Sequence, residues 1–388
     1  MLTTTNHDRS TFVLRVLFLV CLVSAGCAGP AQNNGALPAA VNSVRAMSRT
    51  RDLVGPPIKI TEYSLSGVAD GISGNGAVGP KGDVWLGSQF NLVHVSPNGT
   101  AKAIPIPNPS CGIVCTFAVG PAAYRNDGTI WFAVDYFAGT VGNGGALWVK
   151  SDGVIQGSTS PIGFFDAGTT GNVVIGDDDR VWLLLCGFVF HGGRVCALSA
   201  ATNAAGGSEV DYNLGNFQGN SVASGPDRNL YVTEVSMTGT DSDVAQITEQ
   251  GQLLHRFKLP AGSVGMNGPT SGIAEGADGN LWIVENGINK IARMTPRGTI
   301  TQFPIPTANA DARNITLAVD GSMWFTEYLG NKIGRITPKG IITEYSVPTA
   351  QAGVEGIMAT TTGGCNPSRH GSLWFTEDNS GDVARLDF

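Results

Sequence analysis

The stretch Asp320-Gly321-Ser322-Met323-Trp324-Phe325-Thr326-Glu327, followed by Arg335-Ile336-Thr337-Pro338-Lys339-Gly340, decides the fold of this 388-residue chain. A turn signal precedes a short apolar run that contains a tryptophan, and a second turn signal closes the unit. A second clear copy runs from Asp278-Gly279-Asn280-Leu281-Trp282 to Arg293-Met294-Thr295-Pro296. One such unit holds only a few short strands, so it must bury its faces against neighbouring copies.

Weaker copies extend this pattern along the chain, and the centres of successive copies lie 42 to 51 residues apart. A period of about 40 to 50 residues built from short strands predicts a β-propeller with one blade per repeat. We therefore expect an all-β, seven-bladed propeller of four-stranded antiparallel blades. A large aromatic side chain in each repeat would fill the gap between twisted sheets. The weaker centres are Trp85, Trp131, Trp182, Tyr231 and Trp374.

The propeller template assigns four strands to the clearest repeat, at 314–319, 322–327, 332–337 and 341–347. We name these strands a to d, with strand a nearest the axis. The last repeat ends after a strand c at 383–388, with no strand d behind it. The text ITEYSL at 60–65 matches the strand d text ITEYSV at 342–347. We therefore expect the N-terminal strand to complete the last blade and remove an exposed edge, in a propeller domain spanning 58–388.

The N-terminus has the pattern of an export signal. Arg9 and Arg15 precede an apolar run at 16–23, and small residues lead into Cys27. Residues 1–27 resemble a bacterial lipoprotein signal with Cys27 as the lipid anchor, and ordinary cleavage with free secretion is the alternative. A flexible tether at 28–56 would follow. We therefore expect a monomer that is exported to the bacterial cell envelope or secreted.

Cysteine usage indicates the redox compartment, and the net charge limits the kinds of partner that are expected. Cys186 and Cys196 flank one turn and could bridge a hairpin, and Cys111 and Cys115 could close a small loop, as expected in an oxidising compartment. The formal net charge of −7 and the absence of a basic cluster leave nothing to neutralise a phosphate backbone. Nucleic acid is therefore not expected as a partner. A small-molecule or envelope ligand is expected on the channel face, which we define as the face where each strand a begins and each strand b ends.

Three phrases resemble the repeats of the virginiamycin B lyase family: LWIVE at 281–285, WFTEYLGNKIGRITP at 324–338 and ITEY at 342–345. The resemblance covers 58–388 in architecture and is close from about 268 to 348. It implies a seven-bladed propeller that opens the ring ester of type B streptogramin antibiotics by elimination, with a divalent cation such as Mg²⁺. It also implies a site on the channel face.

The family pattern places a His at the start of strand a in the last two blades and a Glu at the end of strand b in the last blade. Here these positions hold Arg313, Glu355 and either Glu377 or Asp378. Glu355 and Glu377 are the candidate catalytic residues. Glu377 and Asp378 are the candidate ligands of Mg²⁺ or Ca²⁺. An Arg313–Glu355 ion pair across the channel mouth is the competing interpretation.

Further candidates follow from position alone. Asn220 and Ser271 begin strand a of their blades and join Arg313 and Asp378 as candidate ligand-binding residues. Four histidines are expected to be packing or solvated residues: His94, His255 and His370 lie away from the channel entrance, and His191 has no adjacent partner in sequence. The recurring separation of eight residues between a Glu and an Arg, as in Glu327 and Arg335, suggests structural pairs.

Three functions stay open at this point. The missing His pair, the export signal and the tether favour a binding propeller held on the envelope. The acidic group of Glu355, Glu377 and Asp378 favours a carbon–oxygen lyase that opens a cyclic ester. The propeller fold with polar residues around its axis is compatible with a lactonase-like hydrolase. The sequence favours the first.

Overall fold

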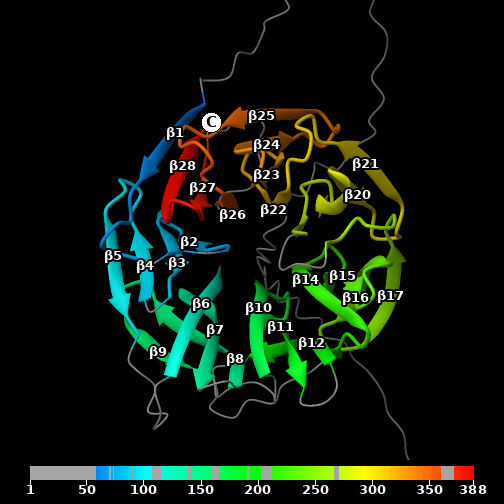
Figure 1. Ribbon diagram of the computed structural model, residues 1–388, viewed down its shortest axis with the longest axis horizontal. Helices are drawn as coiled ribbons and strands as arrows, with labels where there is room; N and C mark the ends of the chain where they lie inside the picture. Colours follow the sequence, from blue (N-terminus) through cyan, green and yellow to red (C-terminus); the bar gives the residue numbers. More distant parts are fainter. Residues whose placement is uncertain are drawn as a thin grey trace, which may run out of the picture.

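The computed structural model describes residues 58–388 except 70, 73, 90, 107–114, 139–140, 159–165, 190–192, 202–211, 266–270 and 360–370. The described residues form seven antiparallel sheets of four strands each. The sheets stand around a common axis, with β2, β6, β10, β14, β22 and β26 toward the centre (Figure 1). The expected all-β propeller with four-stranded antiparallel blades is therefore confirmed.

We number the blades from the N-terminal side. Blade one comprises β2 (Ala77–Val78), β3 (Val84–Gly87), β4 (Asn91–Val95) and β5 (Ala101–Pro105). Blade two comprises β6 (Cys115–Tyr124), β7 (Thr129–Ala138), β8 (Val141–Lys150) and β9 (Ile155–Ser158). Blade three comprises β10 (Asp166–Ile175), β11 (Val181–Val189), β12 (Gly193–Ala201) and β13 (Tyr212–Asn213). Blade four comprises β14 (Phe217–Ser224), β15 (Asn229–Ser236), β16 (Ser242–Thr248) and β17 (Leu253–Lys258).

The C-terminal half continues the pattern. Blade five comprises β18 (Ile273–Glu275), β19 (Leu281–Glu285), β20 (Lys290–Met294) and β21 (Ile300–Pro304), with the 3₁₀ turn η1 (Asn286–Ile288) after β19. Blade six comprises β22 (Ala312–Leu317), β23 (Met323–Glu327), β24 (Lys332–Ile336) and β25 (Ile342–Ser346). Blade seven comprises β26 (Val354–Ala359), β27 (Ser372–Glu377), β28 (Asp382–Asp387) and β1 (Lys59–Tyr63).

Strand β1 lies at the outer edge of blade seven. It pairs antiparallel with β28, with Lys59 opposite Asp387 and Tyr63 opposite Val383. In Figure 1 the blue β1 runs beside the red β28. The two ends of the propeller domain therefore share one sheet.

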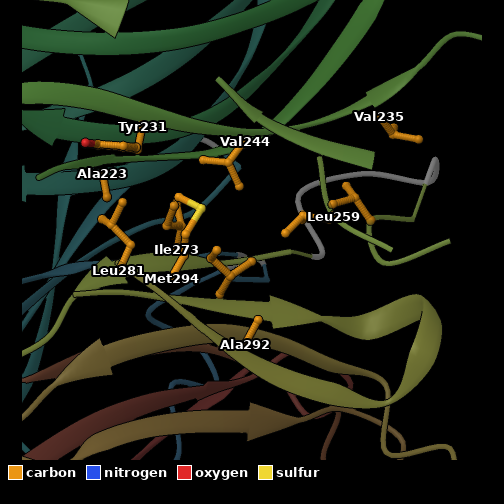
Figure 2. Packing of buried hydrophobic residues seen from close by; sticks show 11 residues of the cluster. Ala223, Tyr231, Val235, Val244, Leu259, Ile273, Leu281, Ala292 and Met294 are labelled. Atoms are coloured by element: carbon orange, nitrogen blue, oxygen red, sulfur yellow. The ribbon is translucent and has the colours of Figure 1, made fainter. Parts of the chain in front are cut away.

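The repeated aromatic residues are buried between blades, as expected. Each of the seven centres has at most 1% of its surface exposed. Figure 2 shows one interface, where Tyr231 and Val244 of blade four pack toward Leu281 and Met294 of blade five. Burial of so much apolar area on both faces of each sheet is what holds neighbouring blades together.

The expected pairing of Glu327 with Arg335 is wrong. Arg335 lies opposite Trp324 and bonds to Asp320 of the a–b turn, with Nε–Oδ2 at 2.8 Å. Side chains alternate along a strand, so Glu327, three residues after Trp324, points to the other face of the sheet. The repeat therefore contains two separate polar features, which are a contact among Asp, Trp and Arg side chains and a buried Glu.

The described residues include only some of the cysteines for which disulfide bridges were predicted. In the hairpin of β11 and β12, Cys186 and Cys196 are direct register partners, and the bridge between them stays a prediction. Cys115 begins β6, whereas Cys111 lies outside the described residues. The signal, the anchor Cys27 and the tether at 28–56 also lie outside them. Within the part of the chain that is described, no helix is long and apolar enough to span a membrane.

Candidate ligand-binding site on the channel face

Arg313 and Glu355 stand at matching β-bulges of neighbouring blades. In β22 the register jumps between Ala312 and Ile315, and in β26 it jumps between Val354 and Ile357. A bulge leaves residues outside the ladder and redirects their side chains. Both bulges occur where strand a begins, so both side chains reach the channel face.

The two side chains form the expected ion pair, with Arg313 Nη1 and Glu355 Oε1 3.6 Å apart. Arg313 also contacts Asp311, with Nη2 to Oδ2 at 3.1 Å, and its guanidinium lies 3.4 Å from the centroid of the Tyr328 ring. The side chains of Arg313 and Glu355 are only 19% and 12% exposed. The pair is thus partly shielded from water, where charge–charge and cation–π contacts gain strength.

Hydrogen bonds from three blades fix the backbone beneath this pair. Asn314 Nδ2 donates to the Glu355 carbonyl at 3.0 Å, and Thr326 Oγ1 donates to the same carbonyl at 2.9 Å. Asn75 of blade one donates through Nδ2 to Asn314 Oδ1 at 2.9 Å and accepts from Ile357 N at 2.8 Å. Asn75 escaped the sequence analysis because it lies in a Gly-rich segment with no recognisable pattern.

Asp378 joins the group from the end of β27. Burial and, second, the Asp378 carboxyl raise the pKa of Glu355, while Arg313 opposes the shift. Burial likewise raises the pKa of Asp378 against the opposing effect of Arg313. The site therefore contains carboxyls that share one guanidinium and hold protons more tightly than free carboxyls do.

Glu377 does not belong to this group. Its side chain is fully buried, accepts a hydrogen bond from Ser380 Oγ at 3.3 Å, and neighbours Glu62 and Asp382. Adjacent residues at a strand end point to opposite sides, so the structure directs Asp378 to Glu355 and turns Glu377 away. The structure therefore does not bring Glu377 and Glu355 together, and their catalytic roles stay a prediction.

Asn220 and Ser271 serve the scaffold between blades four and five. Both are fully buried; Asn220 Nδ2 donates to the Gly265 carbonyl at 2.8 Å, and Ser271 Oγ donates to Asn286 Oδ1 at 2.9 Å. Among the described residues, no hydrogen bond or ion pair joins either of them to Arg313. Asn220 Oδ1 is buried without a partner.

The residues do not fit a divalent cation as arranged. The described ranges contain no group of three or more His, Cys, Asp and Glu side chains placed to hold a metal ion. The Arg313 guanidinium already supplies positive charge to Asp311 and Glu355, and Glu377 faces away from Asp378. The Arg313 guanidinium therefore supplies the positive charge that a metal ion would otherwise bring to this site.

Two histidines have packing roles. His94 Nε2 lies 2.9 Å from Asp83 Oδ2, and its ring stacks on Trp85 at 4.4 Å between centroids. The centroid of the His255 ring lies 5.7 Å from the centroid of the Phe257 ring. His191 and His370 lie outside the described residues.

Fold and site together define a class of protein. It is a propeller of four-stranded blades in which bulges at the start of strand a place polar side chains around one end of the axis. Within this class the chain belongs to the virginiamycin B lyase family, whose model matches residues 158–388, more than half of its length.

Solved structures agree. Virginiamycin B lyase from Staphylococcus aureus is 26% identical, with a TM-score of 0.63, and the match covers 85% of this chain and 99% of that one. A catalytically inactive His-to-Ala variant of that enzyme with quinupristin gives 26% identity, a TM-score of 0.64 and the same coverage. A streptogramin B lyase at 24% identity, with a TM-score of 0.64 over 85% of this chain and 97% of that one, supports the fold alone. No curated protein matches the chain.

Proposed function

We propose that this protein is an exported propeller that binds a small cyclic ester or peptide ligand on its channel face and does not open the ring. One observation carries the proposal: at the positions where the family resemblance places its two histidines, Arg313 and Glu355 form an ion pair 3.6 Å apart. In the S. aureus relative, the variant in which one His is replaced by Ala is catalytically inactive.

The chemistry of ring opening explains why the replacement matters. Elimination requires a base that takes a carbon-bound proton while the ester carbon–oxygen bond breaks, and His suits this near neutral pH. Arg313 is permanently protonated and cannot act as a base. Arg313 pairs with Glu355 and opposes the rise in its pKa, so Glu355 is a weaker base than burial alone would make it.

The same face offers contacts for binding. The Tyr328 ring covers Arg313, and its hydroxyl donates to Asn379 Oδ1 at 3.1 Å. The next residue, Leu329, is 68% exposed and supplies apolar surface. A guanidinium, carboxyls and an apolar rim suit a ligand that combines amide groups with apolar side chains.

The raised pKa of Glu355 favours an alternative, a lyase that works without a metal. Burial and the Asp378 carboxyl hold its pKa above the usual range, which brings Glu355 toward the range of a useful general base. In that case Glu355 would take the proton, and Arg313 would stabilise the carboxylate released from the ester. Nothing in the site favours the lactonase-like hydrolase.

The remaining features of the proposal rest on sequence and strand pairing. Residues 1–27 support export to the envelope or secretion, with Cys27 as the possible anchor. The seven sheets and the β1–β28 pairing support a monomeric, seven-bladed ring that the N-terminal strand closes.

The test combines binding with product analysis, using the full mature chain and quinupristin, the compound present in the relative's complex. Calorimetry measures binding, and chromatography with mass spectrometry follows the ring, because elimination changes retention at unchanged mass whereas hydrolysis adds water. We expect saturable binding without opening, weakened at least about tenfold by Arg313→Ala. Arg335→Ala is the matched control, since Arg335 also pairs with an Asp and faces an aromatic ring.

Opening by the wild type that is lost in Glu355→Gln and insensitive to a metal chelator would instead establish the lyase alternative. Ring opening by Glu355→Gln would contradict both proposals, because the protein would then be a lyase whose base is not Glu355.

A further inference from the structure

A buried glutamate lies at or near the end of strand b in each of the last four blades. Each has none of its surface exposed, although carboxylates are rarely buried without a partner. What differs between the blades is the group that faces this carboxyl. The four residues are Glu234, Glu285, Glu327 and Glu377.

Blades four and five supply donors. In blade four, Arg256 Nε lies 2.5 Å from Glu234 Oε1. In blade five, Gln302 of β21 donates through Nε2 to Glu285 Oε2 at 2.7 Å, and Ser263 Oγ donates to Oε1 at 2.9 Å. Each of these carboxyls therefore has a hydrogen-bond donor from strand d.

Blade six replaces the donor with a carboxyl and adds an ammonium. Glu344 of β25 faces Glu327, and Lys332, the register partner of Glu327, lies 2.7 Å from Glu344 Oε2 through its Nζ. Lys332 Nζ also donates to Thr307 Oγ1 at 2.6 Å. Two carboxyls are thus accompanied by one cation.

Blade seven keeps the carboxyl pair and loses the cation. Glu62 of β1 takes the place of Glu344, because Thr349 N donates to Glu62 Oε1 at 2.8 Å as Thr307 N does to Glu344 Oε1. Asp382 takes the place of Lys332 as the register partner of Glu377. Asp382 Oδ1 in turn accepts from Leu65 N at 2.9 Å, just beyond β1.

We propose that the attachment of β1 to blade seven is proton-linked: Glu377 and Glu62 share one proton, and loss of that proton as the solution becomes alkaline loosens β1. Glu377 Oε1 is buried without a hydrogen-bond partner, and two neighbouring carboxyls at such a site repel each other unless one of them carries a proton. Neither the amide of blade five nor the ammonium of blade six is available to replace it. The polar groups around Glu377 are Glu62 from β1, Asp382 from β28 and the Ser380 hydroxyl, while its β26 register partner is the apolar Val354.

The direction of the pH effect follows from linkage. Burial, then Glu62 and Asp382, raises the pKa of Glu377 to about 7 from its ordinary 4.5. A raised carboxyl pKa means that the folded state holds the proton longer than the unfolded chain, so the stabilisation is complete below about pH 4.5 and is lost as the pH rises to about 7. Such a shift corresponds to a change on the order of 100-fold in the opening equilibrium.

Hydrogen exchange of the β1 amides tests the proposal, measured at about pH 5.5 and about pH 8 and corrected for intrinsic exchange. Strand β5 of blade one is the internal reference, because strand b of that blade ends at Gly87 and not at a buried glutamate, whereas burial also raises the pKa of Glu327 beside β25. In the wild type, β1 protection should fall about 10- to 100-fold relative to β5. Glu62→Gln, which installs the amide found at Gln302, should abolish the difference. Asp382→Lys, which installs the ammonium found at Lys332, should preserve protection at the higher pH.

Equal pH dependence of β1 and β5 in the wild type would overturn the proposal. So would an undiminished pH effect in Glu62→Gln or, where that variant fails to fold, in Asp382→Lys. Restoration of β1 protection by added Ca²⁺ at about pH 8 would also overturn it, because a metal rather than a proton would then join the carboxyls. Glu344→Gln, the same change one blade away, should leave β1 unaffected.

Discussion

At the residue scale, the ion pair was predictable and its surroundings were not. The positions of Arg313 and Glu355 follow from the repeat, because equivalent residues of adjacent blades start their strands side by side. The roles of Glu377 and Asp378 could not be separated in sequence. A shift of one residue exchanges the two faces of a strand, and the end of β27 fixes which residue faces the axis.

The Arg313–Glu355 pair should contribute to stability as well as to the site. Arg313→Ala leaves Glu355 and Asp311 without their cation, and we expect the free energy of unfolding to fall by about 1–3 kcal/mol, less than for a fully buried pair because both groups retain some exposure. Urea unfolding measures this effect. The double variant Arg313→Ala, Glu355→Ala should lose less than the sum of the two single changes, and strict additivity would show that the two side chains do not interact.

At the element scale, the strands of the clear repeats were predicted within about two residues. The strands at 322–327 and 332–337 appear as β23 (Met323–Glu327) and β24 (Lys332–Ile336). The bulges in β22 and β26 were not predicted, because nothing in the sequence of these six-residue strands marks a one-residue shift of register.

Removal of 58–65 should be far more damaging than removal of the tether at 28–56. The first deletion takes away β1 and the fully buried Leu65, and it exposes the hydrogen-bonding edge of β28. We expect a protein that aggregates or melts at least about 10 °C lower. Thermal unfolding of the two truncations provides the comparison, and equal melting temperatures would mean that β1 does not hold the ring.

The interblade aromatic residues should be just as important. Trp324 is fully buried and lies 5.6 Å from the Tyr345 ring and 4.7 Å from the Phe388 ring, between centroids. Trp324→Ala should lower the free energy of unfolding by about 3–5 kcal/mol, because it removes buried apolar area and leaves a cavity. Urea unfolding beside Leu329→Ala, a change at an exposed position, isolates the packing effect; a similar loss in both variants would contradict it.

At the scale of the whole molecule, the architecture could be predicted because every repeat contains similar turns and a buried aromatic residue. The ligand was not readable, because a propeller fold serves many functions and the channel-face groups come from separate blades. Asn75 illustrates the difficulty. It lies more than two hundred residues from Asn314 in sequence, yet donates to it at 2.9 Å.

The site's built-in cation leads to a prediction for the intact molecule. Since Arg313 occupies the space between Asp311 and Glu355, added Mg²⁺ should leave both the melting temperature and quinupristin binding unchanged. Calorimetry and thermal unfolding with Mg²⁺ or a chelator make the comparison. A rise in melting temperature that saturates with Mg²⁺ would restore the expected metal site.

The most direct measurement is chromatography with mass spectrometry of quinupristin after prolonged incubation with a stoichiometric amount of the purified mature protein. Calorimetry on the same sample establishes that the compound is bound. We predict bound and chemically unchanged quinupristin, and loss of binding with Arg313→Ala. A product of unchanged mass and altered retention, formed by the wild type, would contradict the account and make the protein a lyase that dispenses with the His pair.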